Sequence, residues 1–201
     1  MTTRAMASSP NPDKIAKLQE AIENFTGGEI FDTRREEELA PIRKRALLLL
    51  DQRARSRHEL RERLLKLEFE PALVDEVLDS LESSLLIDDA FFASEWVRQR
   101  SRTRGKSTRA LDLELREKGV AADIRAEALA QVTPADEEAQ ARALAEKKAR
   151  EVKAPPADRA EYDKVLRRVV GVLARRGYGS ELTMRVARES LDARIETLTG
   201  E

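Results

Sequence analysis

Apolar residues recur every three or four positions along most of the chain, the spacing that places side chains on one face of an α-helix. Leu60, Leu64 and Leu67 share one such face. We therefore expect an all-α fold without a β-sheet. The pattern predicts helices at 13–25, 42–52, 56–67, 71–83, 89–101, 108–118, 121–131, 134–150, 158–176 and 180–197.

Residues that start and stop helices support these boundaries. Ser56 followed by Glu59 predicts a capping box, in which the hydroxyl accepts a backbone N–H and the glutamate reaches back. Pro41 suits the first turn of a helix, so the charged residues before it are predicted to be solvated. Ser180 is predicted to cap the last helix, and Gly119 to end another because glycine tolerates a positive φ.

The predicted helices form a repeat. An offset of 51 residues places Leu64 on Leu115, and a further 58 places Leu115 on Leu173 and Gly119 on Gly177. Helices of about a dozen residues are marginal alone, so stacked repeats must share their apolar faces. We predict an elongated solenoid of three tandem three-helix repeats, after a flexible N-terminal extension with a short helix. The predicted bounds are 1–40 for the extension and 41–87, 88–132 and 133–198 for the repeats.

Composition narrows the class of protein. Of 201 residues, 41% are hydrophobic but only 4% aromatic, so the core must be aliphatic. The chain has no cysteine, which excludes disulfides and thiolate chemistry. No signal peptide or membrane span is recognisable, and we expect a cytoplasmic protein.

Few residues are candidates for catalysis or metal binding. His58 is the only histidine, so a histidine-based zinc site is excluded, and a solvated surface position is expected. Asp88 and Asp89 can be a metal or acid–base pair, but their place before a helix favours capping and the helix dipole. The G-K-S at 105–107 lacks the earlier glycine and the strand that a phosphate-binding loop needs. We predict no catalytic residue, no metal and no cofactor.

Three aromatic residues, Phe91, Phe92 and Trp96, lie within one predicted helix. Aromatic side chains at helical spacing are usually core residues. The alternative is an exposed platform on which nucleic-acid bases stack. The sequence leaves both interpretations open.

The charge distribution is more informative than the net charge of −1. Residues 68–89 contain eight acids and no Lys or Arg, whereas 97–111 contain six basic residues and no acid. A run of charges is usually a solvated face, but a basic segment recurs at the equivalent place in the first repeat, so a binding surface is equally favoured. The candidate partner-binding residues are Arg53, Arg55, Arg98, Arg100, Arg102, Arg104, Lys106 and Arg109.

The segment "LLIDDAFFASEWVRQR…GKSTRALDLELREKGV" closely resembles the RecX family of bacterial regulatory proteins. The resemblance covers about residues 42–190. The sequence departs from the family pattern at Glu68, where a glycine is expected before Phe69. The resemblance implies tandem three-helix repeats that lie along the filament of RecA on single-stranded DNA and inhibit ATP hydrolysis and strand exchange, without enzymatic activity.

Two functions follow as hypotheses. The first is a monomeric modulator of the RecA filament that meets single-stranded DNA through the filament. The alternative is a helical protein that binds nucleic acid directly, with the basic residues on phosphates. An undetected enzyme is a third and weaker interpretation.

Overall fold

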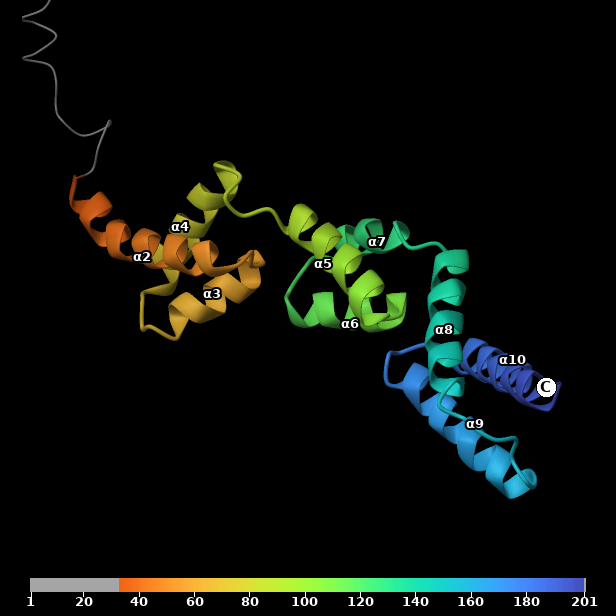
Figure 1. The fold of residues 1–201 in the computed structure, drawn as a ribbon. Helices are drawn as coiled ribbons and strands as arrows, with labels where there is room; N and C mark the ends of the chain where they lie inside the picture. Colours follow the sequence, from red (N-terminus) through yellow and green to blue (C-terminus); the bar gives the residue numbers. More distant parts are fainter. Residues whose placement is uncertain (1–32, 201) are drawn as a thin grey trace, which may run out of the picture. The chain divides into compact units, whose positions relative to one another are not determined.

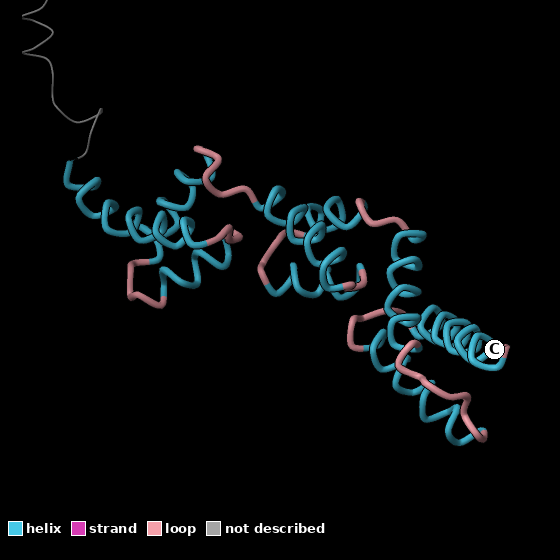
Figure 2. Tube along the Cα trace, in the orientation of Figure 1, coloured by secondary structure: helices cyan, strands magenta, loops and turns pink. Residues whose placement is uncertain are grey.

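The computed structural model describes residues 33–200, and within them every regular element is a helix (Figures 1 and 2). The predicted all-α repeat fold is confirmed, while the predicted helix at 13–25 lies outside the described residues. The nine helices of the described range are α2 (Thr33–Gln52), α3 (Arg57–Leu65), α4 (Pro71–Ser83), α5 (Asp89–Arg104), α6 (Thr108–Glu117), α7 (Ala122–Ala130), α8 (Pro134–Ala149), α9 (Arg159–Ala174) and α10 (Ser180–Thr199).

The first helix starts earlier than predicted. Helix α2 begins at Thr33 and carries Pro41 in its interior, so the prediction that Pro41 starts the helix was wrong. Residues 33–40 contain three Glu and two Arg together with one Leu and one Ala, all good helix formers. Proline has a helical φ and removes one hydrogen bond, to the carbonyl four residues before it. That residue, Glu37, is exposed, so water can bond its carbonyl instead.

The helices fall into three triplets, α2–α4, α5–α7 and α8–α10, and we keep 41–87, 88–132 and 133–198 as proposed repeat bounds. The apolar cores of the second and third triplets are separate clusters. The leucines that the repeat aligns, Leu64, Leu115 and Leu173, are all 0% exposed. Burial at the same register position shows that the periodicity identified the core face correctly.

One left-handed turn recurs at the end of the second helix of each triplet. Gly119 has a φ of +69° and Gly177 a φ of +87°. Glu68, at the equivalent position, has a φ of +62° although it is not a glycine. The first triplet thus keeps the turn that the sequence put in doubt, at the steric cost that a side chain carries in this conformation.

The caps differ from prediction in two places. The Ser56 hydroxyl accepts from the Glu59 N–H at 3.1 Å, as predicted, but the Glu59 carboxylate contacts Arg53 and Lys118 instead of reaching back. The N-cap of α10 is Gly179, without a side-chain cap, so Ser180 does not cap this helix.

Equivalent hydrogen bonds join neighbouring triplets. At the first joint, which comprises 56–59, Asp89 and 118–119, the Arg57 N–H donates to Asp89 Oδ1 at 2.8 Å. At the second joint, which comprises 107–110, Glu137 and 176–178, the Thr108 N–H donates to Glu137 Oε1 at 3.0 Å. In both, the N-terminus of a second helix meets an acid in the first turn of the next triplet. The two joints therefore repeat the same polar contact.

Candidate functional site: basic residues at the joints

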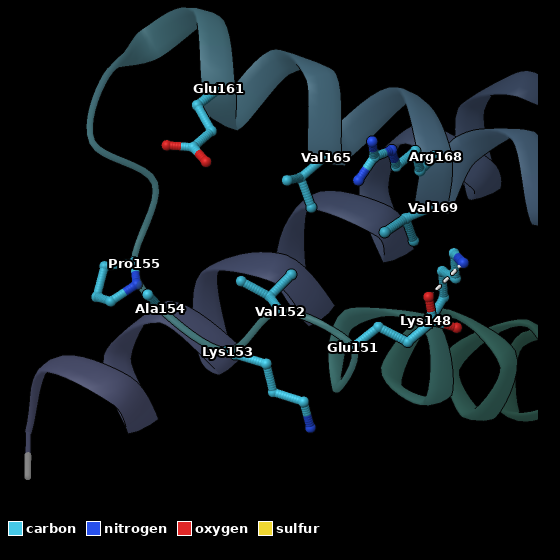
Figure 3. Close-up of a pocket in the computed structure, with 10 residues that line it drawn as sticks. All are labelled: Lys148, Glu151, Val152, Lys153, Ala154, Pro155, Glu161, Val165, Arg168 and Val169. Carbon is cyan, nitrogen blue, oxygen red and sulfur yellow. Dashed lines mark hydrogen bonds and ion pairs between the residues drawn. The ribbon is translucent and has the colours of Figure 1, made fainter.

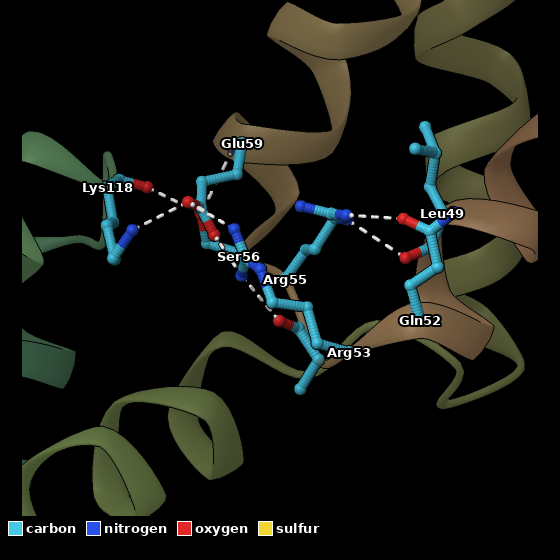
Figure 4. Close-up of polar contacts among 8 residues, drawn as sticks. Leu49, Gln52, Arg53, Arg55, Ser56, Glu59 and Lys118 are labelled. Carbon is cyan, nitrogen blue, oxygen red and sulfur yellow. Dashed lines mark hydrogen bonds and ion pairs between the residues drawn. The ribbon is translucent and has the colours of Figure 1, made fainter.

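A carboxylate organises the basic residues of the first joint. The Glu59 carboxylate accepts hydrogen bonds from the two terminal guanidinium nitrogens of Arg53, each at 3.0 Å, and from the Lys118 ammonium at 2.6 Å (Figure 4). Burial alone would raise the pKa of Glu59, but the hydrogen bonds from Arg53 and Lys118 outweigh it and hold this pKa at about 2. The same Lys118 offers its carbonyl to the Ser56 hydroxyl at 2.6 Å. Glu59 thus joins two triplets through Lys118, and Arg53 holds the same carboxylate from within the first triplet.

A second carboxylate gathers the basic residues of the second triplet. Glu114 contacts Lys106 Nζ at 2.6 Å and an Arg100 nitrogen at 3.4 Å, and accepts the Trp96 indole N–H at 2.9 Å. Arg100 also stacks on the Trp96 ring at 3.5 Å, and Lys118 lies 4.4 Å from its centroid. The candidate residues Arg100 and Lys106 are therefore held by contacts within the protein itself.

Arg55 is buried, with 5% of its surface exposed, so it does not present its charge on the surface. Its Nε donates to the Leu49 carbonyl at 2.9 Å and a terminal nitrogen to Gln52 Oε1 at 3.3 Å (Figure 4). Burial, helped by neighbouring Arg53, lowers the pKa of Arg55. Arg55 satisfies groups in the last turn of α2, which is a structural role.

Exposed arginines remain along α5 and at the start of α6. Arg98 is exposed but forms a two-point ion pair with Glu95. Arg102, Arg104 and Arg109 are exposed, and their side chains have no hydrogen bond or ion pair within residues 33–200. Arg102 and Arg104 lie in the last turn of α5, not in a loop, because the helix continues to Gly105 at a φ of +56°. Among the eight candidate residues, these three arginines are the ones that are exposed without an ion pair in the described part of the chain.

The aromatic residues of α5 divide between core and surface. Phe92 is buried and packs against Trp96 at a centroid distance of 5.5 Å, which confirms the core interpretation for this residue. Phe91 is 64% exposed. A hollow of about 410 Å³ is lined by these aromatics together with Arg53 and Arg100. This hollow therefore brings together Arg53 of the basic segment in the first triplet and Arg100 of the basic segment at 97–111.

The residues considered for metal binding or catalysis, Asp88, Asp89 and His58, contact other parts of the fold. The Asp88 carboxylate accepts the Phe91 N–H at 2.8 Å and caps α5. Asp89 bonds Arg57 at the first joint, and burial raises the pKa of Asp89. His58 lies against Gly119, where an added Cβ would come within 2.4 Å of the His58 Cβ.

Within residues 33–200, no three His, Asp or Glu side chains are grouped as a metal site. No helix there combines the length and hydropathy that a bilayer crossing requires.

A third basic segment, on α9, was not among the candidates predicted from the sequence. Residues 164–180 contain five cations and no acid, the same signal that identified 97–111. Lys148 and Arg168 line a hollow of about 400 Å³ between α9 and the chain that follows α8 (Figure 3). Val165 and Val169 point from α9 toward Val152 in this hollow, which fixes one face of the helix on the core.

Models of two protein domains match the chain. Residues 43–81 match the first three-helix domain of RecX, and residues 88–129 match the second three-helix domain of RecX. These matches contain the segments on both sides of the first joint. The first two helix triplets of the structure, α2–α4 and α5–α7, therefore correspond to a known domain pair.

Known proteins resemble the chain over most of its length. "Regulatory protein RecX" of Corynebacterium efficiens is 56% identical over 192 residues, which covers 92% of this chain and 91% of that protein. The protein of the same name from Mycolicibacterium smegmatis is 40% identical over 165 residues, covering 82% and 86%. A crystal structure of RecX from Lactobacillus salivarius has a TM-score of 0.66 at 24% identity, covering 78% of this chain and 98% of that one. This last likeness supports the fold alone.

Proposed function

The chain belongs to the RecX family of regulatory proteins, and on this basis we propose that it binds the RecA filament on single-stranded DNA and inhibits ATP hydrolysis and strand exchange. The observation that carries the proposal is the 56% identity to a regulatory protein RecX across 92% of the chain. In this role the protein is a monomeric cytoplasmic regulator of recombination, DNA repair and the SOS response, and not an enzyme. It reaches single-stranded DNA through the filament.

Arg102, Arg104 and Arg109 form the proposed filament contact. Their side chains form no hydrogen bond or ion pair in the described part of the chain, so binding does not first have to break an ion pair. Two of them lie at the C-terminus of α5, where the helix dipole favours cations. Arg109 is the second residue of α6, where the dipole disfavours a cation. Its position is thus better explained by a partner with negative charge than by helix stability.

The other predicted contact residues have different roles in this proposal. Arg53, Arg98, Arg100 and Lys106 hold carboxylates of the protein and contribute positive potential around the contact. Arg55 is left out of the contact because it is buried. The proposed surface is therefore smaller than the sequence suggested.

The test is the ATPase activity of RecA on single-stranded DNA while the protein is titrated in. The native protein should inhibit at amounts well below that of RecA. Replacing Arg102, Arg104 and Arg109 with Glu should raise the concentration for half inhibition at least about tenfold, equivalent to about 1.4 kcal/mol. Inhibition by the native protein should also weaken with salt, because exposed charges are screened.

A matched variant controls for the change in net charge. Arg63, Arg116 and Arg188 are exposed and also have no ion pair within residues 33–200. Replacing these three with Glu should leave inhibition nearly unchanged. Equal inhibition by the two triple variants would mean that the arginines at 102, 104 and 109 do not form the contact, and a native protein without effect on RecA would refute the function.

A further inference from the structure

Three of the four hydroxyl side chains in the basic segment 97–111 are used by the fold. The four residues are Ser101, Thr103, Ser107 and Thr108. Ser101 and Ser107 are buried, with 3% and 1% of their surfaces exposed. The Thr108 hydroxyl donates to the Glu137 carboxylate at 3.1 Å, within the second joint. These three hydroxyls are therefore not free for chemistry at the surface.

Thr103 is the remaining hydroxyl, and it is exposed in the last turn of α5. Its Oγ1 donates to the Gln99 carbonyl at 2.6 Å, a bond within the same helix. Arginines lie five, three and one residues before Thr103 and one residue after it. They are Arg98, Arg100, Arg102 and Arg104. Protein kinases select substrates by the charges around the hydroxyl, and this pattern suits a kinase with an acidic substrate groove.

We propose that Thr103 is phosphorylated by a serine/threonine kinase that selects basic segments, and that the phosphate switches off the basic surface around it. The Thr103 Oγ1 forms a bond to the γ-phosphorus of ATP as the bond between that phosphorus and the β–γ bridging oxygen breaks. ADP leaves, and the hydroxyl proton passes to a base of the kinase.

The charge of the phosphate is large enough to change the proposed filament contact. A phosphothreonine carries about −1.5 to −2 charges at neutral pH. This offsets at least about half of the combined charge of Arg102, Arg104 and Arg109. The expected effect on RecA rests on the proposed function, whereas the modification itself does not.

The geometry also gives the phosphate a partner inside the protein. Trp96, Arg100 and Thr103 lie along one face of α5, because steps of four and three residues return to the same side. Arg100 stacks on the Trp96 ring at 3.5 Å and forms a long ion pair, of 3.4 Å, with Glu114. A phosphate three residues further on is within reach of Arg100. Its oxygens accept two parallel hydrogen bonds from a guanidinium, and such pairs are shorter and stronger.

Glu114 does not oppose this exchange. It keeps the Lys106 ammonium at 2.6 Å and the Trp96 indole N–H at 2.9 Å, so the release of Arg100 leaves no unpaired carboxylate. The negative end of the α5 dipole disfavours an anion at Thr103, so the phosphate gains from each guanidinium that neutralises it. Phosphorylation should therefore draw Arg100 away from the Trp96 ring.

The modification is tested without RecA. The folded full chain is incubated with ATP and the catalytic subunit of protein kinase A, a kinase that selects arginine-rich segments, and the phosphate is located by mass spectrometry. It should be found on Thr103, and Thr103→Val should take up little phosphate. Far-ultraviolet circular dichroism checks that each variant is folded.

The movement of Arg100 is read from the fluorescence of Trp96, the only tryptophan of the chain. The full chain is prepared with phosphothreonine encoded at position 103. Loss of the Arg100 stack exposes the indole to water, so the emission should shift to the red relative to the unmodified chain. In Arg100→Gln the stack is already absent, and the encoded phosphate should leave the emission unchanged.

The effect on regulation is measured as RecA ATPase activity on single-stranded DNA. The chain with phosphothreonine at 103 should need an at least about fivefold higher concentration for half inhibition, because charge at a contact governs association. Thr103→Glu should act in the same direction. Thr197→Glu is its matched control and should inhibit like the native chain. Thr197 is an exposed threonine of α10, and its hydroxyl also donates to the carbonyl four residues before it, at 2.8 Å.

The inference is overturned if the kinase leaves Thr103 of the folded chain unmodified, or if the phosphorylated chain inhibits RecA as well as the unmodified one. Equal weakening by Thr103→Glu and Thr197→Glu would also overturn it, since any added negative charge would then suffice. An unchanged Trp96 emission would refute the capture of Arg100. A native chain without effect on RecA would instead refute the proposed function, and the located phosphate and the Trp96 emission would still decide whether Thr103 is the site.

Discussion

Gly177→Ala tests the second joint, where the structure makes a quantitative statement. Gly177 has a φ of +87°, and a residue with a Cβ loses about 1–2 kcal/mol in the left-handed region. The added Cβ would come within 2.7 Å of the Ala110 Cβ and 2.8 Å of the Ser107 hydroxyl. Both neighbours belong to the first turn of α6, where the Ala110 N–H donates to the Ser107 hydroxyl at 3.2 Å.

The two costs add because one is local to the turn and the other is a contact across the joint. Overpacking of this kind costs about 1–3 kcal/mol, so Gly177→Ala should destabilise the protein by about 2–5 kcal/mol in total. For a chain of this length, each kcal/mol lowers the melting temperature by about 2–4 °C. Urea unfolding followed by circular dichroism at 222 nm, and calorimetry, measure the two quantities.

Gly179→Ala is the matched control, two residues away. Gly179 has an ordinary extended backbone, with a φ of −60° and a ψ of 150°, and an added Cβ would meet nothing within 4 Å. The substitution should be nearly neutral, because the conformational entropy that alanine removes from the unfolded chain offsets the poorer fit of alanine at the N-cap of α10. If Gly177→Ala and Gly179→Ala were equally stable, the close approach of α6 to the turn after α9 would be refuted.

Two further substitutions test the equivalent turn and the first joint. Glu68→Gly should stabilise the protein by about 0.5–1 kcal/mol, because it relieves a non-glycine φ of +62°, less the entropy that glycine loses; an unchanged urea midpoint would contradict this. The Glu59 carboxylate, with its pKa held at about 2, contributes stability that is present above pH 4.5 and lost as the pH falls toward 2. Urea midpoints measured across this window should decline for the native protein, whereas Glu59→Gln should already be less stable at pH 7 and decline less; parallel curves would contradict the role of Glu59.

The sequence was sufficient to predict the features that depend on periodicity. Leu64, Leu115 and Leu173 were aligned correctly because a buried face of a helix must repeat every three or four residues. The turn at Gly119 and Gly177 was predictable because glycine is favoured where φ is positive. These signals are local, so one sequence contains them.

The contacts of the charged side chains were not predictable. Glu59 bonds Lys118, which is 59 residues away, rather than the backbone of its own helix. Arg55 and Arg102 look alike in sequence, yet one is buried against the Leu49 carbonyl and the other is exposed. Long side chains choose among nearby partners, and only the packing of the triplets decides which partners are near.

The most direct test of the regulatory proposal is a comparison of affinities for three targets at physiological salt. Labelled native protein is titrated with preformed RecA filaments on single-stranded DNA, with RecA alone, and with the same DNA alone, and binding is followed by anisotropy. A filament modulator should bind the filament much more tightly than either component, and the advantage should shrink when Arg102, Arg104 and Arg109 are replaced with Glu. Affinity for bare DNA equal to or above that for the filament would contradict the account.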